Sequence, residues 1–277
     1  MPVTARRLVR KMRGGAQSHL LEADDGRFYV VKFSNNPQHR RILVNELVGS
    51  VFLRHLEITT PETVLVRVTR EFLREHAEVT FELGRKSIPV EEGWHFGSLF
   101  PGDPDRVAVY DFVPDALLKN VVNLRDFLGA LLFDKWVANA NGRQAVFFRA
   151  RMREWSARAE THPLKVGFLA AMIDQGFAFN GPYWDFPDSP MQGLYPRKIV
   201  YAQVEGWDSF QPCLDQLMHL PEEVMDDAYR AVPLQWLNGD AALLEQLLEK
   251  LHQRRKRIPD LVADCRKALP LLFPRWK

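Results

Sequence analysis

The sequence predicts an α+β protein with two lobes, a β-rich lobe over residues 1–114 and a mostly helical lobe over residues 115–277. Short runs rich in apolar and β-favouring residues dominate the first third of the chain. After Pro114, apolar residues recur mainly at helical spacing. Strands followed by helices are typical of an α+β protein, and the cleft between two such lobes is a natural ligand site.

The elements of the first lobe follow from its apolar runs and its breakers. The predicted strands are His19–Leu21, Arg27–Phe33, Leu65–Val68 and Val107–Val113. Between the second and third of these, apolar residues recur at helical intervals from Arg40 to Leu56, which predicts a helix. Gly93–Pro104 is predicted to be a loop because Gly, Pro and Asp gather there.

The second lobe is predicted to be helical over Leu124–Trp136 and over most of Glu222–Lys256. The Pro-rich and aromatic segment 181–198 has two readings, a packed loop and a loop that recognises a partner. The basic cluster Arg254–Arg257 is interpreted as a solvated face near a helix C-terminus, with an anionic partner as the less favoured alternative.

Composition limits the classes of function. The hydrophobic fraction is 46%, the charged fraction is 26% and the net charge is only +2, so direct nucleic-acid binding is not expected. No apolar run approaches the roughly 20 residues of a membrane-spanning helix. Cys213 and Cys265 are far apart and form neither a metal motif nor a disulfide framework, which favours a cytoplasmic location.

Four features of the first lobe, in this order, fit a site for a phosphate-containing ligand. Gly14–Ser18 is a small-residue turn whose backbone N–H groups can approach an anion. Lys32 lies in the apolar run VVKF, where an unpaired ammonium is costly to bury, and Glu46 on the next helix can pair with it. The apolar run Val109–Val113 can line an adenine pocket. Taken singly, each feature has an ordinary alternative, namely a simple turn, a solvated lysine or an exposed helix residue.

Two segments of the second lobe continue this order. The polar loop Asn139–Gln144 lies between apolar runs, where catalytic groups can be held on a rigid frame. Asp174 interrupts the apolar stretch Lys165–Asn180, and a divalent cation is one partner that offsets its desolvation. A structural cap or salt bridge is the alternative role for Asp174. A lysine, a helix glutamate, a polar loop and an aspartate appear in the order that phosphoryl-transferring kinases use.

The segments GGAQSHLL, YVVKF, VNEL, VAVYDFVPD, FDKWVANANGRQ and MIDQGFAFN, within about residues 14–180, resemble HipA-like kinases. The resemblance implies a bilobal protein-kinase-like fold that uses ATP and Mg²⁺. Asp174 would be the metal ligand. Carried over by position, the resemblance also implies that eight residues contact the nucleotide or hold a residue that does. They are Gly14, Gly15, Ser18, Lys32, Glu46, Tyr110, Asp111 and Val113.

One departure from the family pattern concerns the catalytic loop. Active relatives carry an aspartate where this chain has Asn141, and an asparagine where it has Val146. An amide can orient a hydroxyl but cannot act as a general base near neutral pH. Gln144 can supply a substitute oxygen to the metal, and Arg143 can stabilise phosphate charge.

Three hypotheses therefore stand. The first is an ATP-dependent phosphotransferase that acts on a protein substrate. The second is a pseudokinase that binds nucleotide without turnover, which the residues Asn141 and Val146 motivate. The third is an interaction protein that keeps the fold and binds no nucleotide. Neither the substrate nor the oligomeric state can be read from the sequence.

Overall fold

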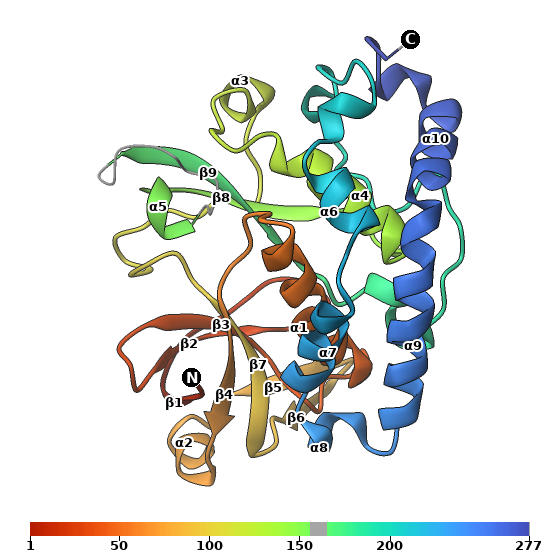
Figure 1. The fold of residues 1–277 in the computed structure, drawn as a ribbon. Coiled ribbons are helices and arrows are strands. Elements are labelled where there is room, and N and C mark those ends of the chain that lie inside the picture. Colours follow the sequence, from red (N-terminus) through yellow and green to blue (C-terminus); the bar gives the residue numbers. More distant parts are fainter. Residues whose placement is uncertain (156–164, 277) are drawn as a thin grey trace.

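Five strands in the first part of the chain close into a small barrel (Figure 1). The structure is a computed structural model that describes residues 1–155 and 165–276. In spatial order the barrel strands are β1 (Val3–Lys11), β2 (His19–Ala23), β3 (Phe28–Lys32), β7 (Gly93–Leu99) and β4 (Thr63–Val68). β1 runs antiparallel to β2 and parallel to β4, and the parallel contact closes the barrel. Side chains such as Tyr29, Val31 and Val66 fill its core.

The strand β7 corrects the prediction of a loop over Gly93–Pro104. β7 pairs with both β3 and β4, so it is an internal strand of the barrel. Gly97 has a packing role there, because a Cβ at this position would lie 2.4 Å from Cγ2 of Val66. A glycine within a strand often marks such a close approach, and it misled the sequence-based expectation.

Val107–Val113, predicted to be a strand, is a loop in the structure. Only Tyr110 pairs with a strand. Its backbone N–H donates to the carbonyl of Phe147 at 2.9 Å, and the Phe147 N–H donates back at 2.8 Å. One bridge of this kind anchors the segment without extending the sheet.

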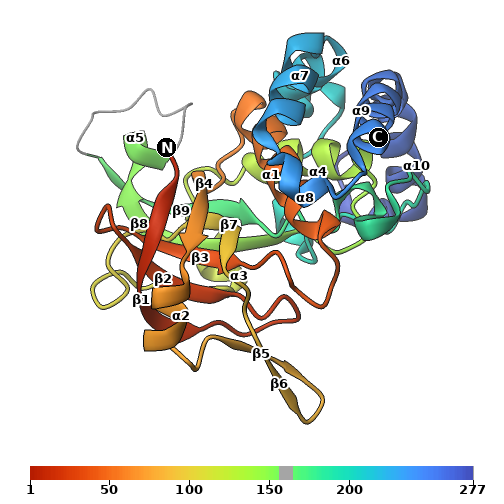
Figure 2. The same ribbon diagram turned by 90° about the horizontal axis from the view of Figure 1, so that it is seen from below.

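A small hairpin and a short helix complete the barrel region. The hairpin strands β5 (Thr80–Leu83) and β6 (Lys86–Pro89) project from the barrel, as Figure 2 shows. Helix α2 (Arg70–Glu75) precedes them, and the Thr69 hydroxyl caps it by accepting the Phe72 N–H at 3.2 Å. At the root of the hairpin Phe81 is buried and meets Phe33 edge to face.

Helix α1 (Arg41–His55) confirms the predicted helix and is buried on almost every side. It contacts β7 on one side and packs more extensively against α7, α8 and η1 on the other. A helix that is apolar all round belongs in the interior, and here it joins the barrel to the helical part of the chain.

The rest of the chain is a two-stranded hairpin, β8 and β9, surrounded by helices (Figure 1). Its elements are α3 (Asp115–Leu118), α4 (Asp126–Trp136), β8 (Gln144–Arg151), α5 (Met152–Trp155), β9 (Val166–Ile173), η1 (Ala178–Tyr183), η2 (Lys198–Val200), η3 (Trp207–Phe210), α6 (Cys213–Met218), α7 (Glu222–Ala231), α8 (Leu234–Leu237), α9 (Ala241–Arg254), η4 (Arg255–Arg257), α10 (Ile258–Ala268) and η5 (Pro270–Leu272). None of the described helices has the length and apolar character needed to cross a membrane.

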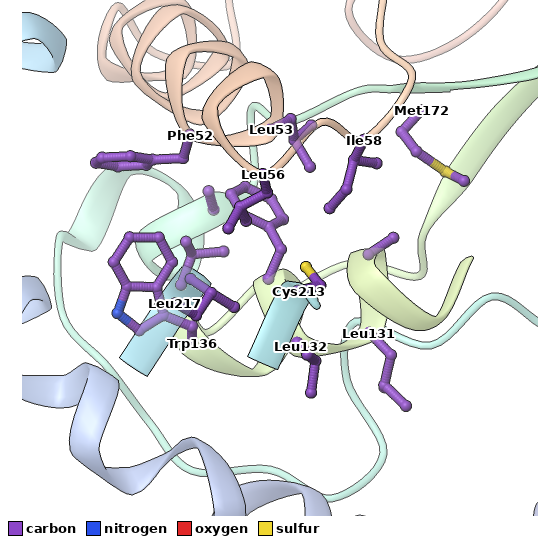
Figure 3. Close-up of a cluster of buried hydrophobic side chains, with 14 of the residues drawn as sticks. Phe52, Leu53, Leu56, Ile58, Leu131, Leu132, Trp136, Met172, Cys213 and Leu217 are labelled. Atoms are coloured by element: carbon purple, nitrogen blue, oxygen red, sulfur yellow. The ribbon is translucent and has the colours of Figure 1, made fainter. Parts of the chain in front are cut away.

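One large apolar core unites α1 with these helices (Figure 3). Phe52 of α1 packs edge to face on Trp136 of α4, with ring centroids 4.9 Å apart. The Trp136 indole N–H donates to the carbonyl of Leu251 at 2.9 Å, so its polar atom is satisfied inside the core. Cys213 of α6 is buried in the same cluster.

Two segments that were interpreted as surface features contain residues that pack in the interior. The predicted solvated face at Arg254–Arg257 is wrong for Arg254, which is 8% exposed, donates to the carbonyl of Trp136 and pairs with Asp188. In segment 181–198 the aromatic residues Trp184 and Tyr195 are buried, which favours the packed loop over the recognition loop.

The buried histidine of β7 predicts a specific dependence of stability on pH. The Nδ1 atom of His95 accepts the Ser34 N–H at 2.9 Å, so Nε2 carries the proton and donates to the Glu91 carbonyl at 3.0 Å. Burial lowers the pKa of His95 from 6.5 to about 4, so the unfolded chain takes up the proton first as the pH falls. Stability from this group is complete above pH ~6.5 and is lost towards pH ~4, by roughly 2 kcal/mol at pH ~5. Urea denaturation at pH ~4 and at pH ~6.5 should show this loss of unfolding free energy in the natural chain and not in the variant His95→Gln. An equal pH dependence of stability in the two proteins would contradict the prediction.

Candidate functional site

Three charged residues meet at the centre of the structure. The Lys32 ammonium, at the end of β3, contacts carboxylate oxygens of both Glu46 and Asp174. Burial alone would lower the pKa of Lys32, but the two carboxylates outweigh it and hold the pKa above its ordinary value. Burial would likewise raise the pKa of Asp174, and the Lys32 ammonium keeps it below its ordinary value. Lys32 and Asp174 are therefore both ionised. With Glu46, the three side chains carry one excess negative formal charge.

Helix α1 fixes the middle member of this triad. Glu46 is 2% exposed and accepts the backbone N–H groups of Gln175 and Gly176 at 3.0 and 2.9 Å. The helix and this segment pack very closely, because a Cβ on Gly176 would lie 2.5 Å from Cγ2 of Ile42. The carboxylate of Glu46 is thus satisfied on all sides and does not need a ligand.

Asp174 differs from Glu46 because it remains open to the cleft. It lies directly after β9 with a left-handed backbone (φ 61°), and its side chain is 35% exposed. The β8–β9 register places Gln144 opposite Ile173, the residue before Asp174. A carboxylate and an amide oxygen are the donors that a hard divalent cation prefers. The described residues contain no cluster of three or more His, Cys, Asp or Glu side chains suited to a metal, so the remaining ligands would be phosphate oxygens and water.

The triad opens into a cleft of about 440 Å³. Of the predicted site residues, this cleft is lined by Ser18, Lys32, Glu46, Asp111, Gln144 and Asp174. The apolar residues Val30, Phe96 and Met172 also line it. A larger cavity of about 890 Å³ shares the wall Leu99–Pro101 with it, but none of the predicted site residues line that cavity.

The structure gives Arg143 a different environment from the one that a phosphate contact needs. Its guanidinium is 1% exposed and pairs with the fully buried carboxylate of Asp134. It also donates to the carbonyl of Ile173 at 2.9 Å and to the side-chain oxygen of Gln175 at 2.5 Å. Asp134 in addition accepts the side-chain amide of Asn139 at 2.9 Å. Arg143 and Asp134 therefore form the frame that holds the polar loop.

Asn141 lies at the exposed tip of this loop and outside the cleft lining. Its side-chain oxygen accepts the N–H of Gly142 at 2.9 Å, and its carbonyl accepts the N–H of Gly193 at 3.0 Å. The loop thus carries an amide on its surface, while the carboxylate of Asp134, which holds the loop through Asn139 and Arg143, is buried.

The small-residue turn reaches the cleft only through its ends. Ser18 and the preceding residues 10–13 line the cleft, whereas Gly14 and Gly15 do not. Gly14 has φ +114°, a conformation that favours glycine. The tip is tied away from the charges, because the side-chain amide of Gln17 exchanges two hydrogen bonds with the backbone of Glu82 in β5.

Of the predicted nucleotide-contacting residues Tyr110, Asp111 and Val113, only one reaches the cleft. Asp111 lines the cleft, but Tyr110 and Val113 do not. Tyr110 uses its backbone on Phe147 and leaves its ring half exposed. Val113 is 2% exposed in the main core.

One residue of this site was not identified from the sequence. Asn45, next to Glu46, is fully buried, and its amide contacts the chain that follows Asp174. A buried asparagine between apolar helix residues is a signal that the local sequence LVNELV did contain.

Known structures with this architecture are kinases. A Golgi casein kinase matches with a TM-score of 0.53 at 14% identity, covering 96% of this chain and 74% of that one. The Golgi casein kinase with Mn/ADP bound matches with 0.51 at 13% identity, covering 96% and 73%. CtkA, a proinflammatory kinase of Helicobacter pylori, gives 0.48 at 14% identity over 99% and 98%. The first two similarities define a kinase fold.

Family membership follows from the sequence itself. The family model described as HipA-like kinase matches residues 6–146, just over half of the chain. The chain therefore belongs to the HipA-like kinase family, which confirms the resemblance stated above. No curated protein is similar enough to count as a match.

Proposed function

We propose that this protein is an ATP-dependent phosphotransferase that modifies a hydroxyl group of a protein substrate. The observation that carries the proposal is the triad of Lys32, Glu46 and Asp174 at the cleft. A lysine held by a helix glutamate, beside an aspartate still open to solvent, suits the charge stabilisation on which phosphoryl transfer depends. The family match and the kinase fold support it.

In this proposal residues 1–114 and 115–277 act as the two lobes of a kinase. The base lies among Val30, Phe96 and Met172, and its polar edge meets the backbone around Asp111. Because Tyr110 pairs with Phe147, the alternation of an extended chain turns the neighbouring backbone groups at Val109 and Asp111 away from β8. Both of these residues line the cleft.

The phosphates lie against Lys32, with Ser18 at the opposite wall. Asp174 and Gln144 would hold Mg²⁺ there. The metal, when bound, supplies positive charge that polarises and neutralises the transferring phosphoryl group. The excess negative charge of the triad favours a cation at this point.

A second candidate is a pseudokinase that binds nucleotide without turnover. The observation that favours it is the commitment of Asp134 to Arg143 and Asn139, which leaves only the amide of Asn141 at the tip of the loop. Such a protein would signal through a change of conformation when nucleotide binds. For both candidates we propose a cytoplasmic location, which the low cysteine content supports, since the chain has only Cys213 and Cys265, far apart in the sequence.

Thermal unfolding with nucleotide and metal tests these proposals. At 100 times the dissociation constant, ADP with Mn²⁺ should stabilise the chain by about 2.7 kcal/mol. Asp174→Ala should lose the part of this shift that depends on metal. No shift at millimolar nucleotide would refute both candidates.

Transfer is then measured with labelled ATP. Incorporation of label into protein, abolished in Asp174→Ala, supports the phosphotransferase. Nucleotide binding without incorporation or ADP release supports the pseudokinase.

A further inference from the structure

The segment that follows Asp174 is attached to α1 by one buried side chain. The side-chain nitrogen of Asn45 lies 2.8, 2.9 and 2.9 Å from the carbonyl oxygens of Gly176, Ala178 and Gly181. Its side-chain oxygen accepts the indole N–H of Trp184 at 2.8 Å. An amide has two N–H donors, which are here shared among three carbonyls, so its donor capacity is used in full.

The neighbours of Asn45 on α1 hold the two ends of the same segment. Glu46 binds its beginning through the N–H groups of residues 175 and 176. Arg41, one turn earlier, binds its end: it donates to the carbonyl of Pro182 at 2.8 Å and lies over the Trp184 ring at 4.4 Å. Arg41 is itself held by Asp240, 2.7 Å away. Residues 175–184 are therefore fastened to one helix at the start, the middle and the end.

This fastening matters because the segment has an uncommon backbone. Asp174, Phe179, Asn180 and Trp184 all have positive φ angles, between 55° and 61°. Residues other than glycine seldom adopt this conformation, and it persists only where the surroundings over-determine it. The Asn45 contacts to the three carbonyls supply that constraint directly after Asp174.

We propose that Asn45 is a positioning residue for the metal-binding Asp174, and this inference rests on the proposed function. By fixing the chain from Gly176 to Gly181 it sets the backbone twist at Asp174 and so the direction of its carboxylate. Removing the Asn45 amide would release the backbone conformation at Asp174 and would leave Lys32 and the apolar pocket for the base unchanged.

The test separates positioning from stability by measuring the coupling between metal and nucleotide. The dissociation constant for ADP is measured by calorimetry in EDTA and in Mn²⁺, and the ratio of the two constants is the coupling. In Asn45→Ala the coupling should fall about 10- to 100-fold, the usual cost of losing a group that orients a metal ligand. Binding in EDTA should stay within about threefold of the natural chain, because no group that faces the base or phosphates has changed.

Two further variants complete the design. Asn45→Ser keeps one donor and should show an intermediate coupling; it also decides the matter if Asn45→Ala does not fold. Trp184→Phe removes the N–H that Asn45 accepts and part of the buried ring, but it leaves the three carbonyl contacts, so the coupling should remain. Coupling in Asn45→Ala and Asn45→Ser equal to that of the natural chain overturns this inference alone. No coupling in the natural chain overturns the proposed metal site and this inference with it.

Discussion

Replacing Arg143 by methionine should lower the free energy of unfolding by about 3–5 kcal/mol, because it leaves the carboxylate of Asp134 buried without its cation. Burial alone would lower the pKa of Arg143, but Asp134 holds it above its ordinary value, so the guanidinium stays charged. With 1% and 0% side-chain exposure, neither partner can turn to water. Urea denaturation followed by circular dichroism measures the loss.

The double variant Asp134→Leu/Arg143→Met is the control. It removes both charges and should recover much of the lost stability, since a buried ion pair is worth little more than apolar residues of similar volume. The contacts of Arg143 to Ile173 and Gln175 are still lost, so recovery should be incomplete. A stable Arg143→Met that binds nucleotide weakly would instead restore the predicted phosphate role of Arg143.

The variant Lys32→Met should weaken binding of ADP with Mn²⁺ by roughly 30- to 5,000-fold, which corresponds to the 2–5 kcal/mol typical of losing one partner of a buried charged contact. It removes the ammonium that meets the phosphates and leaves Glu46 and Asp174 facing the same space without a cation. The pKa of Asp174 should rise in the variant, because Lys32 is the main group that holds it down. Calorimetric titration at neutral pH measures the affinity.

Arg10 offers a matched control for Lys32. It also lines the cleft, but it is exposed and has no place in the buried triad. Arg10→Ala should cost only a few-fold in affinity, and that cost should shrink as salt is added, since exposed charges are screened. Equal losses in both variants would mean that the cleft binds nucleotide by general positive charge and not through the triad.

The sequence indicated which charged residues meet in this site better than it indicated the strands and loops that hold them. Lys32 and Asp174 stand out because each is a lone charge in an apolar run, and the structure brings them together with Glu46. A buried charge needs a partner, so desolvation marked both residues, whereas Glu46 was chosen from the order of residues that kinases use. The mixed α and β content and the family were predictable for similar reasons of pattern and motif.

The errors come from places where tertiary contacts decide. β7 contains two glycines and a serine, and it is a strand because it lies between β3 and β4. β1 was not predicted, because arginines interrupt its alternation, yet it closes the barrel. The loop residue Arg143 looked available for phosphate, and only the fold reveals that Asp134, nine residues earlier, is its partner.

The packing of α1 decides which members of the triad would separate if the cleft opened. Helix α1 packs more extensively against α7, α8 and η1 than against β7, so Glu46 shares its packing with the segment that follows Asp174, whereas Lys32 belongs to the barrel strand β3. The two ion pairs thus act as an electrostatic latch across the cleft: opening the cleft would separate the Lys32 ammonium from the carboxylates of Glu46 and Asp174 in a single step. A ligand that brings both an anion for the lysine and a dication for the carboxylates replaces each half of the latch, so it can enter without leaving either side of the cleft with an unpaired charge.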